Sequence, residues 1–484
     1  MIPELSFTTP VFIFLFLPIT LAAYYALRGT RLRNVVLFVA SLVFYASNGL
    51  FYLIPLLFTC VLDYIVGARL AAMGDGARRK ALFVASVAIQ IGLLSVFKYA
   101  GWLSLEAQHF ATTLGLGLAI APIVLPLPPG ISFYTFHTIS YTADIYRHRF
   151  RPQGNVVDYI TFVGFFPQLV AGPIARASNL LPQIVQLPPL PSRAEIEESM
   201  WLIWWGLSKK LLFADRFGDV VGSAERAIAS GHASGAGYVF MYAFGFQIYC
   251  DFSAYTDIAR GIAKLFGIEL TRNFRTPYFS ASPSEFWHRW HISLSTWLRD
   301  YLYIPLGGNQ HGALRTLRNL LVTMFLGGLW HGAGFGFIVW GLYHGVLLVL
   351  YHTGKLDERI RAALGPRLGA AIAIFVMFQL VSIGWIFFRA QPGALGPIFA
   401  SLAAAPTAIL ANPAMAPMAK MLLLLGLPVA VTELVGYLAD VEFVDLYRHF
   451  PLALKIVFYN VAIGALIYVW VSGSVAPPFI YYKF

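Results

Sequence analysis

Long apolar runs separated by short polar loops are the dominant pattern along this 484-residue chain. An α-helix needs roughly 20 apolar residues to cross the hydrocarbon core of a bilayer, and many of the runs approach that length. We expect apolar helices near 10–27, 35–47, 51–68, 81–99, 109–125, 130–146, 157–170, 200–214, 236–250, 252–267, 319–331, 334–352, 368–388, 419–438 and 455–472. Some are too short or too polar to span alone. The pattern therefore predicts an all-α polytopic integral membrane protein with roughly eleven transmembrane helices plus re-entrant and interfacial helices.

The composition excludes several other classes of protein. Hydrophobic residues make up 58% of the chain and charged residues 12%, whereas a soluble domain has about 25% charged residues. The apolar runs are too long and unbroken for the alternating strands of an outer-membrane barrel. The net charge of +11 does not indicate nucleic-acid binding, because the basic residues cluster in short loops between apolar runs, as the positive-inside rule predicts for cytoplasmic loops.

Two basic loops give the expected orientation of the first helices. They carry Arg28, Arg31 and Arg33, and Arg78, Arg79 and Lys80. Two apolar runs separate these loops, so both lie on the cytoplasmic side. The start of the chain lacks a basic n-region and a small-residue cleavage site, so we expect the first run to be a retained span and the N-terminus to lie outside. Cys60 and Cys250 give neither a disulfide framework nor a metal spacing, so we expect no metal.

Two helix starts are marked by capping residues. Ser192 with Glu195, and Ser282 with Glu285, have the spacing of capping boxes. We expect the second to open a helix over 286–306. Its aromatic and apolar residues form one stripe at helical spacing, namely Trp287, Trp290, His291, Leu294, Trp297, Leu298 and Tyr301. The helix is too polar to cross lipid alone, so it should lie at an interface or line a cavity. A histidine on such a stripe is more often a packed residue than a catalyst, and both interpretations stay open.

A second histidine stands in an uncharged stretch. Residues 320–350 contain no Lys, Arg, Asp or Glu, but they include His331 and His344. A charge at membrane depth costs on the order of 2.5 kcal/mol or more, so an imidazole there is a functional-site hypothesis. His331 stands in Gly327-Gly-Leu-Trp-His-Gly332, whose glycines also permit close helix packing. His331 could therefore be a structural residue or a proton carrier. In the second case the ring of Trp330 would give a flat surface for a substrate. We interpret His344 as a packing residue.

Two acidic residues bracket the apolar segment Cys250-Asp-Phe-Ser-Ala-Tyr-Thr-Asp257. Carboxylates inside a membrane need partners. Structural ion pairing of Asp251 and Asp257 is the simpler interpretation, and Arg260 is one helical turn beyond Asp257. The alternative is a proton or ion path, as in a transporter.

Further motifs follow one another along nearly the whole chain. They are Gly130-Ile-Ser-Phe-Tyr-Thr-Phe136, Phe165-Phe-Pro-Gln-Leu-Val-Ala-Gly-Pro-Ile174, Gly206-Leu-Ser-Lys-Lys-Leu211, Asn273-Phe-Arg-Thr-Pro-Tyr278, Phe286-Trp-His-Arg-Trp-His-Ile-Ser-Leu294, Trp297-Leu-Arg-Asp-Tyr-Leu-Tyr-Ile-Pro-Leu-Gly-Gly308, Gly384-Trp-Ile-Phe-Phe-Arg-Ala390 and Pro478-Phe-Ile-Tyr-Tyr-Lys-Phe484. Each motif alone is a weak signal. Together with the segments around Asp251 and His331, the ordered set resembles the membrane-bound O-acyltransferase family, most closely its bacterial branch that acts on alginate and teichoic acids.

The resemblance implies one membrane-embedded acyltransferase domain over 1–484, with helices around a central cavity that is reached from both sides of the bacterial inner membrane. It implies that His331 matches the catalytic histidine of the family and that His291 matches a second histidine near the same cavity. Both are candidate catalytic residues, and His291 would position the donor or acceptor or share the proton. His288 lies off the apolar stripe, and we do not expect it to take part in the chemistry. The candidate substrate-binding residues are Trp330, Trp290, Asp257 and Tyr255.

The expected donor is an acyl thioester such as acetyl-CoA, which is made in the cytosol and is too charged to cross lipid. The expected acceptor is a hydroxyl of an exported polysaccharide or of a periplasmic carrier protein, and we expect no tightly bound cofactor. His331 would act as general base on that hydroxyl. Acetyl is favoured over D-alanyl, and the acceptor polymer stays open. The alternative function is a transporter or flippase for a lipid-linked or acyl intermediate, with Asp251, Asp257 and Arg260 as coupled charges.

Overall fold

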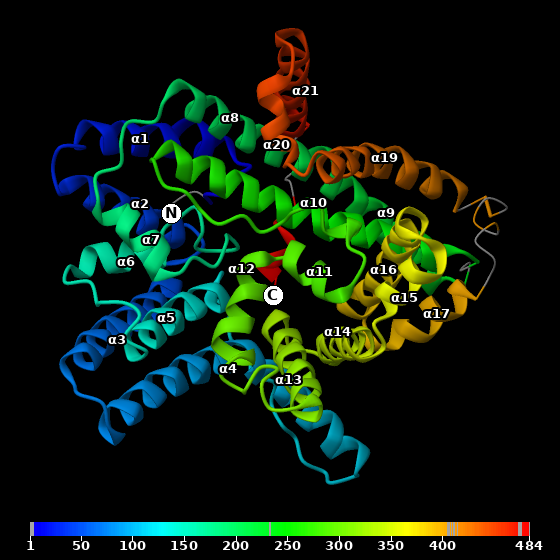
Figure 1. Ribbon diagram of the computed structural model, residues 1–484, viewed down its shortest axis with the longest axis horizontal. Helices are drawn as coiled ribbons and strands as arrows, with labels where there is room; N and C mark the ends of the chain where they lie inside the picture. Colours follow the sequence, from blue (N-terminus) through cyan, green and yellow to red (C-terminus); the bar gives the residue numbers. More distant parts are fainter. Residues whose placement is uncertain are drawn as a thin grey trace. The chain divides into compact units, whose positions relative to one another are not determined.

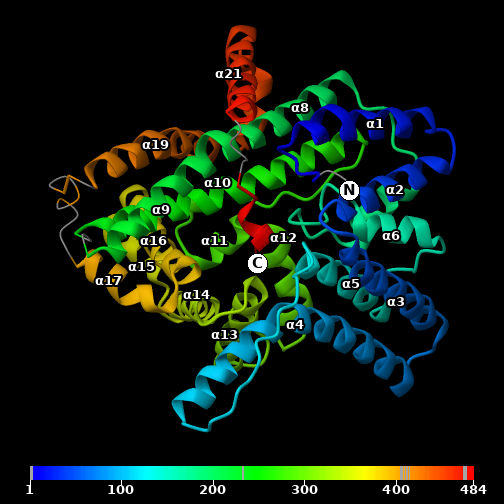
Figure 2. The ribbon, with the colours of Figure 1, turned by 180° about the vertical axis from the view of Figure 1, so that it is seen from behind.

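The computed structural model describes residues 4–231, 234–403, 407, 409, 412–413, 415–472 and 477–483. Across these residues the regular secondary structure is helical and no strand is found, which confirms the all-α prediction. Figures 1 and 2 show the helices from opposite sides. The chain divides into two compact units: the first is Met1–Ile203, Ile258–Thr271 and Tyr481–Phe484, and the second is Trp204–Asp257 and Arg272–Ile480.

The first unit contains the N-terminal helices. They are α1 (Leu17–Ala26), α2 (Leu32–Ala46), α3 (Leu53–Ala72), α4 (Ala77–Thr113), α5 (Ile131–Tyr146), α6 (Val156–Gly164), α7 (Ala177–Val185) and most of α8 (Arg193–Ser208). Helix α8 begins at the first predicted capping box, where the Ser192 N–H donates to the Glu195 carboxylate at 2.7 Å and the Glu195 N–H donates to Ser192 Oγ at 3.3 Å. Helix α3 packs against α5, and a Cβ on Gly67 would lie 2.8 Å from the Tyr141 ring, so this approach requires glycine.

The second unit contains the helices that carry the candidate chemistry. They are α9 (Asp215–Ala229), most of α10 (Ala236–Leu265), α11 (Pro283–Arg289), α12 (Ile292–Leu298), α13 (Ala313–His331), α14 (Phe335–Gly354), α15 (Leu356–Leu364), α16 (Pro366–Arg389), α17 (Leu395–Leu402), α19 (Ala416–Ala439), α20 (Phe443–Leu446) and α21 (Leu452–Val471).

Helices α13 and α14 pack against one another over much of their length (Figure 1). A Cβ on Gly328 would lie 2.3 Å from the Phe337 carbonyl oxygen, and one on Gly341 would lie 2.4 Å from the Met324 carbonyl oxygen. Side chains at both positions are therefore excluded, and the backbones of the two helices come into direct contact, as small residues permit in membrane proteins. This contact brings the end of α13 against the first turns of α14.

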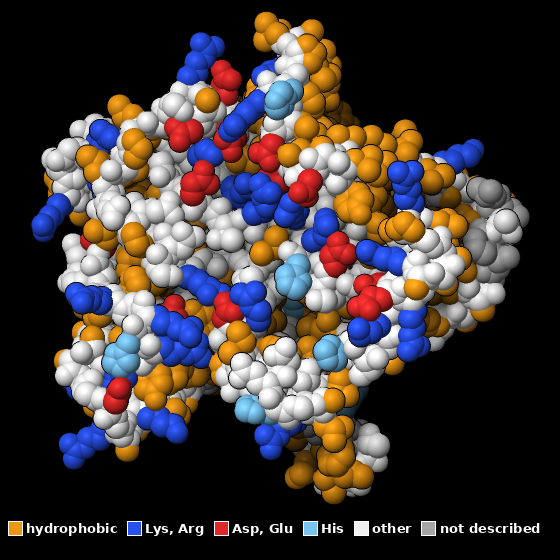
Figure 3. Space-filling view, viewed as in Figure 1, with side chains coloured by type: hydrophobic (Ala, Val, Ile, Leu, Met, Phe, Trp, Pro, Cys, Tyr) orange, Lys and Arg blue, Asp and Glu red, His pale blue; other side chains and the backbone are white. Residues whose placement is uncertain are grey.

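The chain is a multi-pass membrane protein. Six helices of the described residues are long and apolar enough to cross a membrane: Leu50–Ala72, Ala77–Thr113, Phe335–Gly354, Pro366–Arg389, Ala416–Ala439 and Leu452–Val471. Phe12–Ala26 and Leu32–Ala46 are shorter apolar helices. Figure 3 shows hydrophobic side chains gathered over α19 and α21, where the more than half exposed residues include Leu423, Leu427, Leu438, Val457, Val461 and Val471. The count of about eleven spans stays a prediction.

Two pairs of helices that the sequence predicts as separate are not separate in the structure. The separate helices expected near 81–99 and 109–125 are replaced by the single helix α4, and residues 116–128 have no helical structure. Gly115 and Gly117 have φ values of 64° and 63°, so the backbone leaves the helix at these glycines despite the apolar residues that follow. The helices expected near 236–250 and 252–267 are one continuous helix, α10.

The stretch 390–418 is rich in Ala and Pro and nearly uncharged, a composition that favours an irregular or surface-lying connection, but in the structure it is partly helical. It contains α17 and the start of α19. Residues 404–406, 408, 410–411 and 414 lie outside the described residues.

Candidate active site

Helix α13 ends on His331, and the backbone continues in an extended conformation at Gly332. The imidazole is 3% exposed. Its ring lies edge-on to Trp340 of α14, with 4.9 Å between the centroids, and 5.3 Å from the ring of Phe388 on α16. The glycine contact between α13 and α14 therefore places the imidazole in an aromatic environment at a packed helix end.

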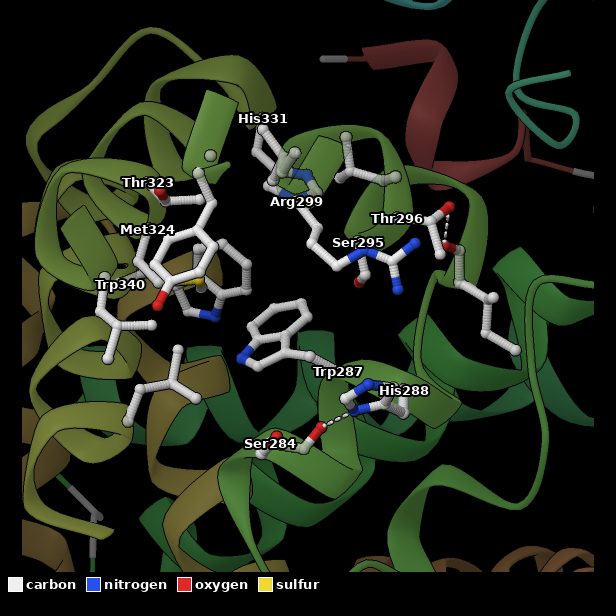
Figure 4. Close-up of a pocket in the computed structure, with 17 residues that line it drawn as sticks. Ser284, Trp287, His288, Ser295, Thr296, Arg299, Thr323, Met324, His331 and Trp340 are labelled. Atoms are coloured by element: carbon white, nitrogen blue, oxygen red, sulfur yellow. Dashed lines mark hydrogen bonds between the residues drawn. The ribbon is translucent and has the colours of Figure 1, made fainter. Parts of the chain in front are cut away.

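A cavity of about 210 Å³ lies beside this imidazole (Figure 4). Its exposed lining residues include Ser284, His288 and Arg299. Its buried lining residues include Thr323, Met324, Gly327, His331 and Trp340. Leucines and Trp287 form much of the remaining wall. The cavity thus leads from a polar, exposed mouth along apolar walls to a buried inner end that carries His331.

The single helix expected over 286–306 is interrupted at the second candidate histidine. The capping serine is confirmed, because Ser282 Oγ accepts the Glu285 N–H at 3.2 Å and α11 starts there. Helix α11 ends at Arg289, however, and α12 starts at Ile292. Between them the backbone of His291 has φ 44° and ψ 53°, a left-handed conformation that residues other than glycine rarely adopt.

Asn273 is the physical reason for the interruption. Its carbonyl oxygen accepts the Ile292 N–H at 2.9 Å, and its side-chain oxygen accepts the Ser293 N–H at 3.1 Å. Asn273 is completely buried, so these bonds form away from water. The bonds satisfy the first amides of α12, which a continuous helix would have bonded within itself. Since Asn273 is distant in sequence, the local stripe could not reveal the break.

His291 is completely buried and lies next to His331 without lining the cavity. The centroids of the two imidazoles are 6.4 Å apart, and the ring of Trp330 lies 5.9 Å from His291 and 5.0 Å from His331. The His291 ring also lies edge-on to Phe252 at 4.6 Å. Burial lowers the pKa of His291 to about 3, so the ring is neutral near pH 7.

None of the four residues predicted to bind substrate lines the cavity. Trp330 is 5% exposed and packs on His331. Trp290 is 1% exposed and lies among aromatic rings. Tyr255 contacts the Phe479 ring at 5.1 Å, and Asp257 is paired with a lysine. Their proposed contact with substrate stays a prediction.

Two lysines of the Ser-Lys-Lys motif hold the acidic residues of α10. Lys209 Nζ lies 2.6 Å from the Asp257 carboxylate, and Lys210 Nζ lies 2.8 Å from Asp251 and 2.9 Å from Asp215. Burial acts to lower the pKa of Lys210, but the two carboxylates outweigh burial and raise it, so Lys210 is charged. The Asp251 carboxylate also accepts the Ile480 N–H at 2.6 Å. These contacts agree with structural ion pairing, although the sequence did not single out the lysines.

Sequence reasoning missed several residues that line the cavity. His288 was set aside because it lies off the apolar stripe, yet it stands at the mouth, where its Nδ1 lies 2.6 Å from the Ser284 carbonyl oxygen. Arg299 stands at the same mouth and is paired with Asp300 at 2.7 Å. Trp340 at the inner end was not considered. The one sequence signal for Trp340 is its position in the next apolar run after His331, beyond the glycines at 332, 334 and 336.

The arrangement suits proton transfer inside a membrane. An imidazole at the end of an apolar cavity can take a proton from a hydroxyl group and return it, because histidine titrates near neutral pH. The described residues contain no group of three or more His, Cys, Asp or Glu that could hold a metal ion.

Comparison with known proteins assigns the chain to a family of enzymes. Residues 147–354, which include both histidines, match the membrane-bound O-acyltransferase family. A probable alginate O-acetylase of Pseudomonas aeruginosa is 38% identical over 80% of this chain and 72% of its own length. A peptidoglycan O-acetyltransferase of Helicobacter pylori is 32% identical over 80% of this chain and 77% of its own length. A teichoic acid D-alanyltransferase of Streptococcus thermophilus is 28% identical over 54% of this chain and 67% of its own length.

The expected resemblance is therefore confirmed, and the buried histidine at the end of its cavity lies within the matched region. The relatives, the helical membrane fold and the ordered motifs all agree on one assignment. The chain is an acyltransferase that belongs to the membrane-bound O-acyltransferase family.

Proposed function

We propose that this protein transfers an acetyl group from an acyl thioester to a hydroxyl group, with His331 as the general base. The observation that supports the proposal most directly is the position of His331 at the buried inner end of a cavity with a polar mouth. Two relatives are named for O-acetylation of alginate and peptidoglycan, which favours acetyl as the acyl group and a glycan hydroxyl as the acceptor. The third is named for D-alanyl transfer, so the acyl group needs a direct test.

In the proposed reaction the hydroxyl oxygen attacks the thioester carbonyl carbon while the His331 imidazole takes the hydroxyl proton. The electron pair of the C=O π bond moves onto the carbonyl oxygen, which gives a tetrahedral intermediate. When the C=O bond re-forms, the carbon–sulfur bond breaks and the leaving thiolate takes the proton from the imidazolium. The products are an ester and a thiol, and the imidazole is neutral again. General base catalysis of this kind contributes typically about 10²–10⁴-fold.

His291 supports this reaction as a positioning residue. It is neutral, completely buried and 6.4 Å from His331 between ring centroids. Trp330 contacts both imidazoles, so His291 and Trp330 together form a wall behind the base. A second titrating group in this position would compete for the transferred proton, and the low pKa of His291 avoids that competition.

The membrane location of the reaction follows the same proposal. The protein lies in the bacterial inner membrane with about eleven spans and a periplasmic N-terminus. The donor is acetyl-CoA or another thioester from the cytosol, and the acceptor is a polysaccharide or a carrier protein on the periplasmic side. A buried site solves the problem that the charged thioester cannot cross lipid.

The direct test is replacement of His331 by Ala and by Gln in the full-length protein. Membrane levels of each variant are checked by immunoblot, and acetyl esters on the exported polymer are measured after mild alkaline release. We expect both variants to lose acetylation at normal protein level. His352→Ala is the matched control, because His352 is an exposed residue at the end of α14. Normal acetylation with His331→Ala would refute the proposal.

A different outcome of the same experiment would support the alternative function, a transporter. Loss of acetylation with Asp257→Ala together with normal acetylation for His331→Ala would favour it. The acyl group and the donor are tested with inverted membrane vesicles and [¹⁴C]acetyl-CoA, where incorporation of label into polymer must depend on His331.

A further inference from the structure

The indole of Trp340 is buried and lines the cavity beside His331. Its side chain is 1% exposed, and no acceptor among the described residues lies within hydrogen-bond distance of its Nε1–H. An indole N–H can only donate, and a buried donor without a partner costs free energy comparable to a lost hydrogen bond. Such a group in a native structure needs an explanation.

The neighbouring tryptophan of α16 shows that this local environment can satisfy an indole. Trp385 stacks on Trp340 with 5.9 Å between centroids and is equally buried. Its Nε1–H donates to Tyr278 Oη at 3.2 Å. The difference between the two indoles is their position, because Trp340 lines the cavity beside His331 and Trp385 does not.

Trp287 covers Trp340 on the cavity side. It also lines the cavity, its ring centroid lies 5.8 Å from that of Trp340 at an interplanar angle of 84°, and its own Nε1–H has no acceptor among the described residues. Figure 4 shows both indole nitrogens on the edges of the rings that approach one another. Trp287 is partly exposed, whereas Trp340 is fixed between His331, Trp385 and Phe388.

We propose that the Trp340 Nε1–H donates a hydrogen bond to the carbonyl oxygen of the bound acyl thioester and stabilises the oxyanion that forms there. Trp287 shields this donor from water and moves aside when the acyl group enters. The proposal rests on the acyl transfer proposed above and assigns the group that holds the developing negative charge.

The chemistry agrees with the geometry. While His331 takes the hydroxyl proton, the π electron pair of the C=O bond moves onto the carbonyl oxygen, and a hydrogen bond from Trp340 becomes stronger as charge develops. The bond weakens again when the C=O bond re-forms and the thiolate leaves with the proton. A neutral donor held rigidly in a water-excluded site acts in this way because it needs no reorganisation during the reaction. The ring centroids of His331 and Trp340 lie 4.9 Å apart and both residues line the same cavity, which in this proposal places both beside the bound acyl group.

The test removes the N–H donor and keeps an aromatic ring at position 340. Full-length Trp340→Phe is solubilised in detergent, and thiol release from acetyl-CoA is measured with an oligosaccharide acceptor for wild type and variants. We expect kcat to fall roughly 10²–10³-fold, as for loss of one oxyanion donor, while KM for acetyl-CoA changes little. Replacement of Trp340 by β-(3-benzothienyl)alanine, in which sulfur replaces the N–H at nearly the same shape, should give the same fall and excludes a packing defect.

Trp102→Phe is the matched control, because it removes an indole of α4, outside the cavity lining, whose N–H donates to Glu106 at 3.0 Å. It should keep kcat near that of wild type. An unchanged kcat for both Trp340 variants would overturn the proposal. The two proposals fail separately: if wild type is active, His331→Ala is inactive and the Trp340 variants are fully active, only the oxyanion assignment is wrong. If His331→Ala is as active as wild type, the proposed function itself is wrong.

Discussion

Gly328 of α13 and Gly341 of α14 lie in direct backbone contact: a Cβ on Gly328 would lie 3.0 Å from the Gly341 Cα. The contact is three residues from His331 on one helix and one residue from Trp340 on the other. The proposed base and the proposed oxyanion donor are therefore set against one another by two residues that carry no side chain.

Replacement of Gly341 by Ala should separate α13 from α14. The added Cβ would lie 2.4 Å from the Met324 carbonyl oxygen, and overpacking of this kind costs typically about 1–3 kcal/mol. We expect lower thermal stability in detergent and a strong loss of acetylation at equal protein level. Gly464→Ala on α21 is the control, because a Cβ there would meet nothing within 4 Å. Equal activity of the two variants would contradict a role for the contact in positioning the site.

Replacement of Lys210 by Met should destabilise the second unit. The change leaves Asp251 and Asp215 buried without their cation, and breaking one partner of a buried pair costs about 3–5 kcal/mol. We expect low membrane levels and faster limited proteolysis near Ile480, whose N–H is bonded to Asp251. Lys355→Met is the control, because Lys355 is an exposed residue paired with Glu358. Similar protein levels for the two variants would show that the buried pair is not stabilising.

Asn273 should be required for the break between α11 and α12. Asn273→Ala removes the acceptor of the Ser293 N–H, and a buried donor left without a partner costs roughly 1–3 kcal/mol. We expect lower stability together with altered activity, since Trp287 and His291 flank this break. Asn460→Ala removes a side chain that bonds only its own helix at an exposed position, and it should have little effect. Hydrogen exchange at Ser293 gives the most local measurement.

The free energy of unfolding should decrease as the pH is lowered, because of His291. Burial lowers its pKa from about 6.5 to about 3 in the folded state. Between these values the unfolded state binds the proton and the folded state does not. The stabilising contribution is therefore complete above pH 6.5 and is lost as pH falls towards 3, by about 1.4 kcal/mol per pH unit. Thermal unfolding between pH 4 and 7 should show this dependence in wild type and a weaker one in His291→Asn. His352→Asn, at an exposed site, should behave as wild type.

The class of protein and the family could be predicted from the sequence, whereas the role of His331 stays a prediction. Hydropathy and composition are local properties, and an uncharged run that contains a histidine is visible without coordinates. The features that were missed depend on distant partners. Lys209 and Asp257 are 48 residues apart, and Asn273 interrupts a stripe that looks like one continuous helix.

Features of the local sequence also explain why two predicted helix boundaries were wrong. The helices expected near 236–250 and 252–267 leave out Asp251, but this residue is paired with Lys210 and α10 continues through it. Apolar residues after Thr113 suggested a further helix, but two left-handed glycines end α4. Trp340 lies in none of the motifs, because its proposed role depends on the contact between α13 and α14.

The left-handed backbone at His291 also restricts which amino acids that position can accept. A β-branched residue there would be strained whatever its chemistry, and even alanine would carry a conformational penalty that has nothing to do with an imidazole. Asparagine and glycine tolerate this backbone best. A His291→Ala variant would therefore mix two defects, whereas His291→Asn keeps the turn and removes only the ring. Among natural sequences, residues that tolerate a left-handed backbone should therefore be preferred at this position, whatever the chemistry of their side chains.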